Sequence, residues 1–184
     1  MFKFLIIFFI LNFYNPAFSS KKENLISQMQ LTNNLSFNFI QTINNKNENG
    51  KCIIRYPKKI WCEYDNSNKK IIVSNGKSLV IKTANKGSYY LYPLNKTPLE
   101  FLLDKEYLIS KISILKLREI DDKYFSFKIF EKNNEINIFF DKEDLSLVGW
   151  QTEDIYQNFV VTFISSVKIN KKINDKIFIL PKNN

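Results

Sequence analysis

Apolar and polar residues alternate with a period of two over most of this chain. The segment 35–42 shows the pattern clearly, because Leu35, Phe37 and Phe39 share one face with Gln41 while the other face is mostly polar. Such alternation is typical of a half-buried β-strand. We therefore predict a strand here, and further strands at residues 52–56, 59–64, 70–74, 79–83, 88–92, 124–130, 136–140, 146–152, 158–167 and 176–180.

Turn-forming residues separate these segments. Asparagine, glycine and proline favour the tight conformations that connect antiparallel strands. Short strands divided in this way predict an antiparallel meander. The predicted breaks are Asn49-Gly50, Tyr56-Pro57, Asn75-Gly76, Lys86-Gly87 and Asn133-Asn134.

Two segments carry helical signals instead. Residues 23–33 place Leu25, Ile26 and Met29 at helical spacing, which predicts a short amphipathic helix. A second helix is predicted to start at Thr97. This threonine is in an N-cap position, a proline follows at the first helical position, and a glutamate stands where a capping box needs it.

Length and composition fit one mainly β domain with helices, of the α+β class. The chain has 184 residues, of which 45% are hydrophobic and 24% charged, so it should fold around a core. A twisted sheet of about ten strands rarely stays open and bare, so we expect it to curl, with the helices across its mouth. Periodicity does not distinguish a filled interior from a ligand cavity.

The amino terminus has the features of a secretory signal peptide. Lys3 supplies the positive charge, residues 4–13 form an apolar run, and Ala17-Phe18-Ser19 places small residues before a cleavage point. The apolar run is about half the length that a membrane span needs. We predict that residues 1–19 are removed and that residues 20–184 form a single domain in an exported, oxidising compartment.

Composition argues against most enzymatic chemistry. The chain has no histidine, which removes the usual general base and the commonest metal ligand, and two cysteines cannot complete a zinc site. Neighbouring carboxylates at residues 121–122 and 143–144 lie in polar segments, where solvated charge is the simpler explanation. We expect neither an enzyme nor a cofactor or metal. The formal charge of +9 is nearly all lysine, so nucleic-acid binding is not expected either.

Several short motifs resemble those of the LolA family of periplasmic lipoprotein carriers, in the same order along the chain. IVSNGKSL at 72–79 resembles the family's V-S-D-G-K-x-L hairpin, and YPKKIWCEY at 56–64 resembles R-P-G-K-x-R-F-x-Y. The others are FIQT at 39–42, TPL at 97–99, LVGW at 147–150 with Asp154, and FILP at 178–181.

The resemblance implies both a fold and a function. The fold would be an unclosed antiparallel half-barrel of ten to eleven strands with a helical lid. The function would be carriage of acylated lipoproteins across the periplasm, by a monomer that takes them from an ATP-driven inner-membrane transporter and delivers them to the outer membrane or a receptor there. Such a carrier needs an apolar concave surface and no cofactor.

The family register also implies which residues bind the acyl chains. Each of them has an alternative role in ordinary core packing. The expected cavity residues are Leu35, Phe37, Phe39, Ile54, Ile60 and Tyr64, and the expected lid residues are Met29, Leu99, Leu102 and Leu103.

One position departs from the family pattern. The family's arginine before the proline, which latches the lid in closed forms, corresponds to Tyr56 here. Arg55 lies one residue earlier and would point to the opposite face of a strand. Either the Tyr56 hydroxyl is a weaker latch in its place, or the lid closes differently here. Arg55 is expected to face solvent or form a salt bridge.

The two cysteines, Cys52 and Cys62, lie on either side of Pro57. If the turn centres on this proline, Ile54 faces Ile60 and the cysteines face each other across antiparallel strands. They would then form a cross-strand disulfide, or remain two small buried thiols. A regulatory or sensory module on the same half-barrel, binding a signal lipid or a protein, is the alternative to a carrier.

Overall fold

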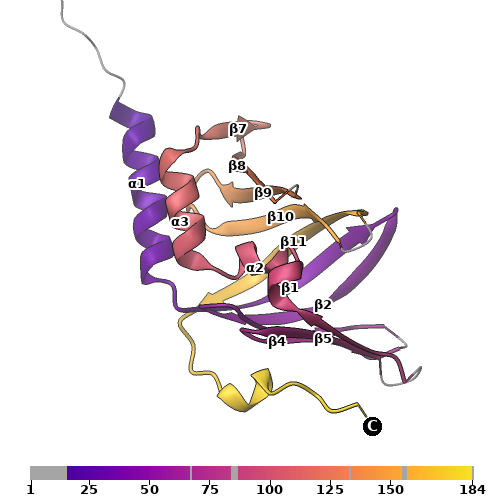
Figure 1. Ribbon diagram of the computed structural model, residues 1–184. Coiled ribbons are helices and arrows are strands. Elements are labelled where there is room, and N and C mark those ends of the chain that lie inside the picture. Colours follow the sequence, from indigo (N-terminus) through magenta and orange to yellow (C-terminus); the bar gives the residue numbers. More distant parts are fainter. Residues whose placement is uncertain (1–15, 67, 84–86, 133, 155–156, 184) are drawn as a thin grey trace, which may run out of the picture.

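The computed structural model describes residues 16–66, 68–83, 87–132, 134–154 and 157–183. Eleven antiparallel strands form one sheet in the order β6-β5-β4-β3-β2-β1-β11-β10-β9-β8-β7 (Figure 1). The strands are β1 (Asn34–Ile43), β2 (Lys46–Arg55), β3 (Lys59–Tyr64), β4 (Lys70–Asn75), β5 (Ser78–Thr83), β6 (Tyr89–Pro93), β7 (Arg118–Ile120), β8 (Tyr124–Glu131), β9 (Asn134–Asp141), β10 (Leu147–Glu153) and β11 (Phe159–Ile169).

The sheet consists of two meanders joined at its centre. Strands β1 to β6 follow one another outward on one side, strands β11 back to β7 do so on the other, and β1 pairs with β11 in the middle. Strands β6 and β7 are the two edges, so the sheet is unclosed. It is the curled, mainly β half-barrel with helices that the sequence and the family resemblance predict.

Alternating residues give the sheet its concave face. Along β1 the buried positions are Leu35, Phe37 and Phe39. Asn38, which lies between two of them, and Ile40, which follows the last, are exposed. The other strands repeat this pattern, because successive side chains of a strand point to opposite faces. On the concave face Ile60, Cys62 and Tyr64 come from β3, Phe125, Phe127 and Ile129 from β8, and Ile136, Ile138 and Phe140 from β9.

Three helices lie over the concave face (Figure 1). They are α1 (Pro16–Leu31), α2 (Leu99–Leu102) and α3 (Lys105–Ile114), and α1 packs against α3. The short 3₁₀ helix η1 (Leu94–Lys96) precedes α2, and a second one, η2 (Asp175–Phe178), follows β11. Residues 1–15 of the predicted signal peptide lie outside the described residues, and its predicted cleavage point falls within α1.

The second helical segment differs from its prediction. Thr97 does not cap the start of α2; it is the C-cap residue of η1, and its hydroxyl donates to the carbonyl of Leu94. Pro98 is the N-cap residue of α2, which ends after a single turn. The chain then starts α3, a helix that the pattern did not reveal, with the Asp104 carboxylate accepting from the backbone N–H of Tyr107.

Two predictions about strands are also wrong. Asn49-Gly50 is not a turn but lies within β2; the hairpin turn is at Asn44 and Asn45, whose positive φ angles of 49° and 61° suit asparagine. The predicted strand at 176–180 is instead the 3₁₀ helix η2, because the Asn174 side chain accepts from the backbone N–H of Lys176 and starts a helical turn. The short edge strand β7 was not predicted.

The carboxyl-terminal segment covers part of the convex face. Phe178 is buried, η2 lies against β3 and β4, and Arg55 forms a salt bridge with Asp175. Below this segment, Val73 and Val80 point to the convex side and are almost fully buried. The salt bridge of Arg55 is one of the two roles expected for it.

Candidate functional site

The first of two apolar cavities lies between the helices and the sheet. It measures about 230 Å³. Its walls include Met29 of α1, Leu102 of α2 and Leu108 of α3, so all three helices close it on one side. Leu35, Ile54, Ile60, Ile138 and Phe140 line it from the sheet.

The second cavity is larger, about 340 Å³, and lies toward the opposite ends of the strands. Phe39, Cys52, Cys62 and Ile72 form its apolar wall on the side of β1 to β4. Tyr90 and Tyr92 of the edge strand β6 border it as well, with their rings stacked at a centroid separation of 6.5 Å. This volume lies within the range of about 300 to 1,000 Å³ that small-molecule sites occupy.

Three residues line both cavities. They are Ile60 of β3, Leu99 of α2 and Trp150 of β10. Leu99 belongs to the one-turn helix, so a movement of α2 would change both cavities at once. The two spaces therefore form one concave apolar site with a partition at α2.

The structure places most of the predicted site residues on these walls. Leu35 and Ile54 line the smaller cavity, Phe39 and Tyr64 the larger one, and Ile60 both. The predicted lid residues Met29, Leu99, Leu102 and Leu103 all border the smaller cavity.

Phe37 is the exception, since it lines neither cavity. Its side chain is only 3% exposed and packs edge-on against the Trp150 ring, with centroids 6.0 Å apart. Phe37 is therefore a core residue beneath the partition, which is the role that periodicity left open for each predicted cavity residue.

Several wall residues were not predicted from the sequence as part of the site. Trp150 was noted only as part of a motif, and Ile138, Phe140 and Val167 only as members of predicted strands. The period-two pattern places Ile138 and Phe140 on the inner face, whereas Val167 is out of phase with Val160, Thr162 and Ile164 and reaches that face through a shift in the β1–β11 register. Which inner residues border open space depends on how the two halves of the sheet curl toward each other. No local signal carries that information.

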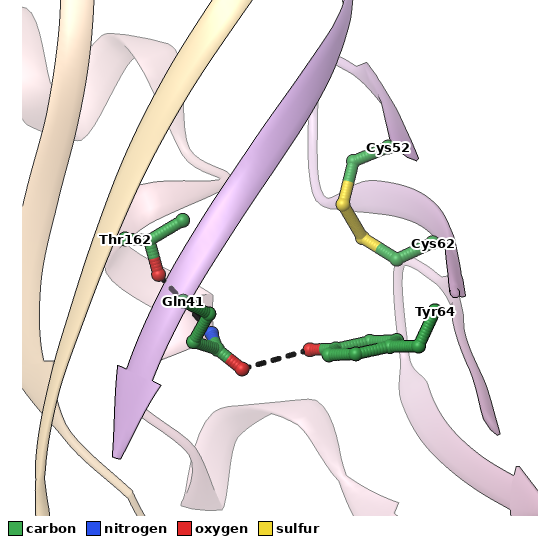
Figure 2. Close-up of a disulfide and its surroundings, with 5 residues drawn as sticks. All are labelled: Gln41, Cys52, Cys62, Tyr64 and Thr162. Carbon is green, nitrogen blue, oxygen red and sulfur yellow. Dashed lines mark hydrogen bonds between the residues drawn. A yellow bond between two sulfur atoms is a disulfide. The ribbon is translucent and has the colours of Figure 1, made fainter. Parts of the chain in front are cut away.

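The larger cavity has a polar end (Figure 2). The Tyr64 hydroxyl donates to Gln41 Oε1 at 3.0 Å, and Gln41 Nε2 donates to Thr162 Oγ1 at 3.1 Å. Burial, together with the charge of Glu48, raises the pKa of Tyr64, so its phenol stays protonated. Lys70, Glu153 and Asp154 border the same cavity.

Gly50 allows this arrangement. A Cβ atom at this position would lie 2.8 Å from the Phe39 ring and 2.2 Å from the carbonyl oxygen of Glu63. Without a side chain there, Phe39 and Tyr64 meet across β2 in an edge-on contact with centroids 4.9 Å apart. A glycine that looked like a turn residue is thus needed for close packing at the cavity wall.

Cys52 and Cys62 form a disulfide that lies in the wall of the larger cavity (Figure 2). Strands β2 and β3 pair with Ile54 opposite Ile60 and Cys52 opposite Cys62, which is the register predicted from a turn at Pro57. The bridge joins the strands close to Tyr64 and so fixes one side of the site.

The lid is fastened by a residue that the sequence analysis did not select. Lys58, in the turn between β2 and β3, donates its backbone N–H to the carbonyl of Leu103 at 2.7 Å. Its Nζ lies 3.4 Å from Glu100 Oε1 and 3.3 Å from Asp104 Oδ2. Burial lowers the pKa of Lys58, but hydrogen bonds with Asp104 and Glu100 outweigh burial and raise the pKa above its usual value.

Tyr56, the candidate latch, lines the smaller cavity. Its backbone N–H donates to the carbonyl of Asn33, and burial raises the pKa of its phenol to about 12. Within the described ranges its hydroxyl has no hydrogen bond to the helices. The contacts between this turn and the lid come from Lys58 instead.

Helix α3 has a second attachment to the sheet. Glu131, at the end of β8, forms a 2.9 Å ion pair with Lys111 and accepts a 3.0 Å hydrogen bond from the Tyr107 hydroxyl. These hydrogen bonds to Lys111 and Tyr107 lower the pKa of Glu131. The ion pairs of both lid attachments are formed by partly exposed side chains.

Two further observations concern membrane spans and metal-binding clusters among the described residues. No helix in this part of the chain is long and apolar enough to cross a bilayer. Nor do three or more Cys, Asp or Glu side chains come together there in a way that would hold a metal ion.

These features define a class of protein: an open antiparallel half-barrel that encloses an apolar site under a helical lid. Residues 30–180 match the family model described as outer membrane lipoprotein carrier protein LolA. The chain therefore belongs to the LolA family.

Solved structures with this fold share little sequence with the chain. An uncharacterised conserved protein from Thermus thermophilus aligns with a TM-score of 0.52 at 7% identity, over 89% of this chain and 94% of that one. MucB in the Pseudomonas aeruginosa MucA/MucB complex aligns with a TM-score of 0.50 at 9% sequence identity, over 90% of this chain and 62% of that one. The LolA superfamily protein NE2245 from Nitrosomonas europaea aligns with a TM-score of 0.46 at 8% sequence identity, over 86% of this chain and 97% of that one. No curated protein sequence matches the chain.

Proposed function

We propose that this protein is a periplasmic carrier that shelters the acyl chains of lipoproteins in its concave site and moves them from the inner to the outer membrane. One observation carries the proposal: two adjoining apolar cavities lie under helices that polar surface contacts hold in place. Membership of the LolA family supports the same substrate class.

The energetics suit reversible binding. Each buried methylene contributes about 0.8 kcal/mol, so a dozen sheltered methylenes give about 10 kcal/mol before the costs of ordering are subtracted. Such a site needs no covalent chemistry, only an apolar surface and a lid that opens. An unclosed sheet allows the cavity to widen without breaking strand pairing.

Export is part of this proposal. A carrier between two membranes must reach the periplasm, and we propose that residues 1–19 act as its signal peptide. A disulfide between Cys52 and Cys62 is compatible with that oxidising compartment. Intact-mass measurement of the protein from the periplasmic fraction should give a chain that begins at Ser20; retention of Met1 would contradict export by cleavage.

A regulatory module is the second candidate. The similarity to MucB, which was solved in complex with MucA, favours it because the two proteins share the fold. That module would bind a protein partner or a signal lipid and would not release lipoproteins from a membrane. This chain spans only 62% of the MucB chain, so a protein-binding role like that of MucB does not follow from the shared part alone.

A pair of leucine variants tests the acyl-binding site. Leu99 borders both cavities, whereas Leu91 is 56% exposed and borders neither. A carboxylate in an apolar site costs several kcal/mol unless it reaches water. We expect Leu99→Glu to weaken binding of a palmitoyl probe at least tenfold, about 1.4 kcal/mol. We expect Leu91→Glu to bind like the wild type. Equal binding by both variants, each with a normal thermal midpoint, would contradict the proposed site.

A further inference from the structure

The two cavities differ in the state of their polar groups. Three polar side chains that border the smaller cavity donate to backbone oxygens: Gln28 to Asp144, Thr32 to Gln28, and Lys105 to Gln30 and Thr32. The rest of its wall is apolar apart from Tyr56 and Ser146.

The larger cavity is different at its polar end. Gln41 Nε2 carries two protons and donates one of them to Thr162 Oγ1, and the Thr162 hydroxyl carries a proton of its own. In the described part of the chain, neither the second amide proton nor the hydroxyl proton has an acceptor. Thr162 is only 2% exposed, so the cavity is the space from which an acceptor can reach it.

Tyr64 fixes the direction of these donors. Its phenol donates to Gln41 Oε1, so the amide nitrogen of Gln41 is turned toward Thr162. Figure 2 shows the three side chains in a row from β3 through β1 to β11. The Phe39 ring and the disulfide-bonded strands hold Tyr64 in place. The donors are thus oriented before any ligand arrives.

We propose that the Gln41–Thr162 pair is a carbonyl-recognition subsite, at which the larger cavity binds the ester or amide carbonyl of an acyl chain. The proposal rests on the acyl-binding function proposed above and adds a chemical preference to it. A carbonyl oxygen accepts two hydrogen bonds through its two lone pairs, which matches the two available protons. A bare hydrocarbon would leave both protons without an acceptor, at a cost in affinity.

The subsite also sets the direction of the ligand. With its carbonyl at Gln41 and Thr162, an acyl chain extends along the apolar wall toward Ile60, Leu99 and Trp150, where the larger cavity meets the smaller one. Its head group is then at the rim with Lys70 and the acidic residues 153–154.

A pair of lipids that differ only in the carbonyl tests this proposal. Monopalmitoylglycerol has an ester carbonyl, and 1-O-hexadecylglycerol has an ether in its place with the same chain length. Each would displace N-phenyl-1-naphthylamine, a neutral fluorescent probe without a carbonyl, from the mature protein. One net hydrogen bond changes affinity by about five-fold, so we expect the wild type to bind the ester at least that much more tightly than the ether.

Two variants and a control complete the test. Thr162→Val keeps the shape of the side chain and removes the hydroxyl, and Gln41→Met removes the amide. Either should abolish the preference for the ester, because it weakens ester binding more than ether binding. Thr42→Val, on the opposite face of β1 from Gln41, should keep the preference.

The outcomes separate this inference from the function on which it rests. Ester preference in the wild type that is lost in either folded variant supports the subsite. Equal binding of ester and ether by the wild type overturns the subsite and leaves the acyl carrier intact. Failure of the fluorescent probe and of both lipids to bind overturns the two proposals together. Thermal midpoints identify a variant that is unfolded, and the other variant then decides.

Discussion

Removing the disulfide should destabilise the half-barrel by an amount that the structure sets. Cys52 and Cys62 are ten residues apart in sequence, and the loop-closure entropy of such a bridge corresponds to about 2.7 kcal/mol at 25 °C. For a domain of this size, that loss lowers the midpoint of thermal unfolding by about 5 to 11 °C. Both sulfur atoms border the larger cavity, so their removal enlarges an existing space.

The assay compares thermal unfolding of the wild type and of the Cys52→Ala/Cys62→Ala variant, each with and without reductant. We expect reductant to lower the wild-type midpoint to near that of the variant and to leave the variant unchanged. Titration of the denatured wild type without reductant should find no free thiol. Two free thiols in protein taken from the periplasm, or a wild-type midpoint that reductant does not move, would refute the reasoning.

Three further predictions concern the core and the lid. Phe37→Ala should cost about 3 to 5 kcal/mol in unfolding free energy, measured with urea, and leave lipid affinity unchanged, because Phe37 packs in the core and lines neither cavity. Lys58→Met should remove both ion pairs to α2 and its flank; faster amide exchange at Leu102 and Leu103 would show this, and unchanged exchange would contradict Lys58 as a lid fastening. The folded-state pKa of Glu131 is lowered, so its stabilising contacts are present above the ordinary glutamate value of 4.5 and are lost as pH falls through the lowered value. The protection of α3 amides, measured as exchange relative to the intrinsic rate at each pH, should therefore decrease at low pH in the wild type, and Glu131→Gln should remove that pH dependence.

Most of the fold could be predicted from the sequence because it depends on local signals. Period-two alternation identified nearly all strands, including β1 with Leu35, Phe37 and Phe39 on its buried face. The turn at Pro57 was sufficient to set the register of β2 and β3. Both signals act over a few residues and survive when the rest of the fold is unknown.

The errors arose where a tertiary contact overrides a local preference. Gly50 has the local signature of a turn, but its lack of a side chain is used for packing between Phe39 and Tyr64. Residues 176–180 have the composition of a strand, yet the sheet offers them no edge beside β3 and β4, and Phe178 is instead buried on the convex face. The local sequence pattern indicates neither the close packing at Gly50 nor the lack of a free sheet edge for residues 176–180.

The site could be predicted only in part for a related reason. Alternation and the family register placed Ile54 and Ile60 on the inner face, where the structure shows the cavities. Which inner residues face open space depends on the curl of the sheet and on contacts between distant strands. Gln41 and Thr162 are 121 residues apart, so their pairing follows only from the central β1–β11 pairing.

Release of an outer-membrane lipoprotein from spheroplasts tests the central claim most directly, because a regulatory module and a carrier differ in this activity. The mature wild type, added to spheroplasts, should release the lipoprotein as a soluble complex. Ile54→Glu, in the wall of the smaller cavity, should fold and release little, while Asn38→Glu on the opposite face should release as much as the wild type. Wild-type protein that binds acyl probes but releases no lipoprotein, or folded Ile54→Glu that releases it normally, would contradict the carrier function.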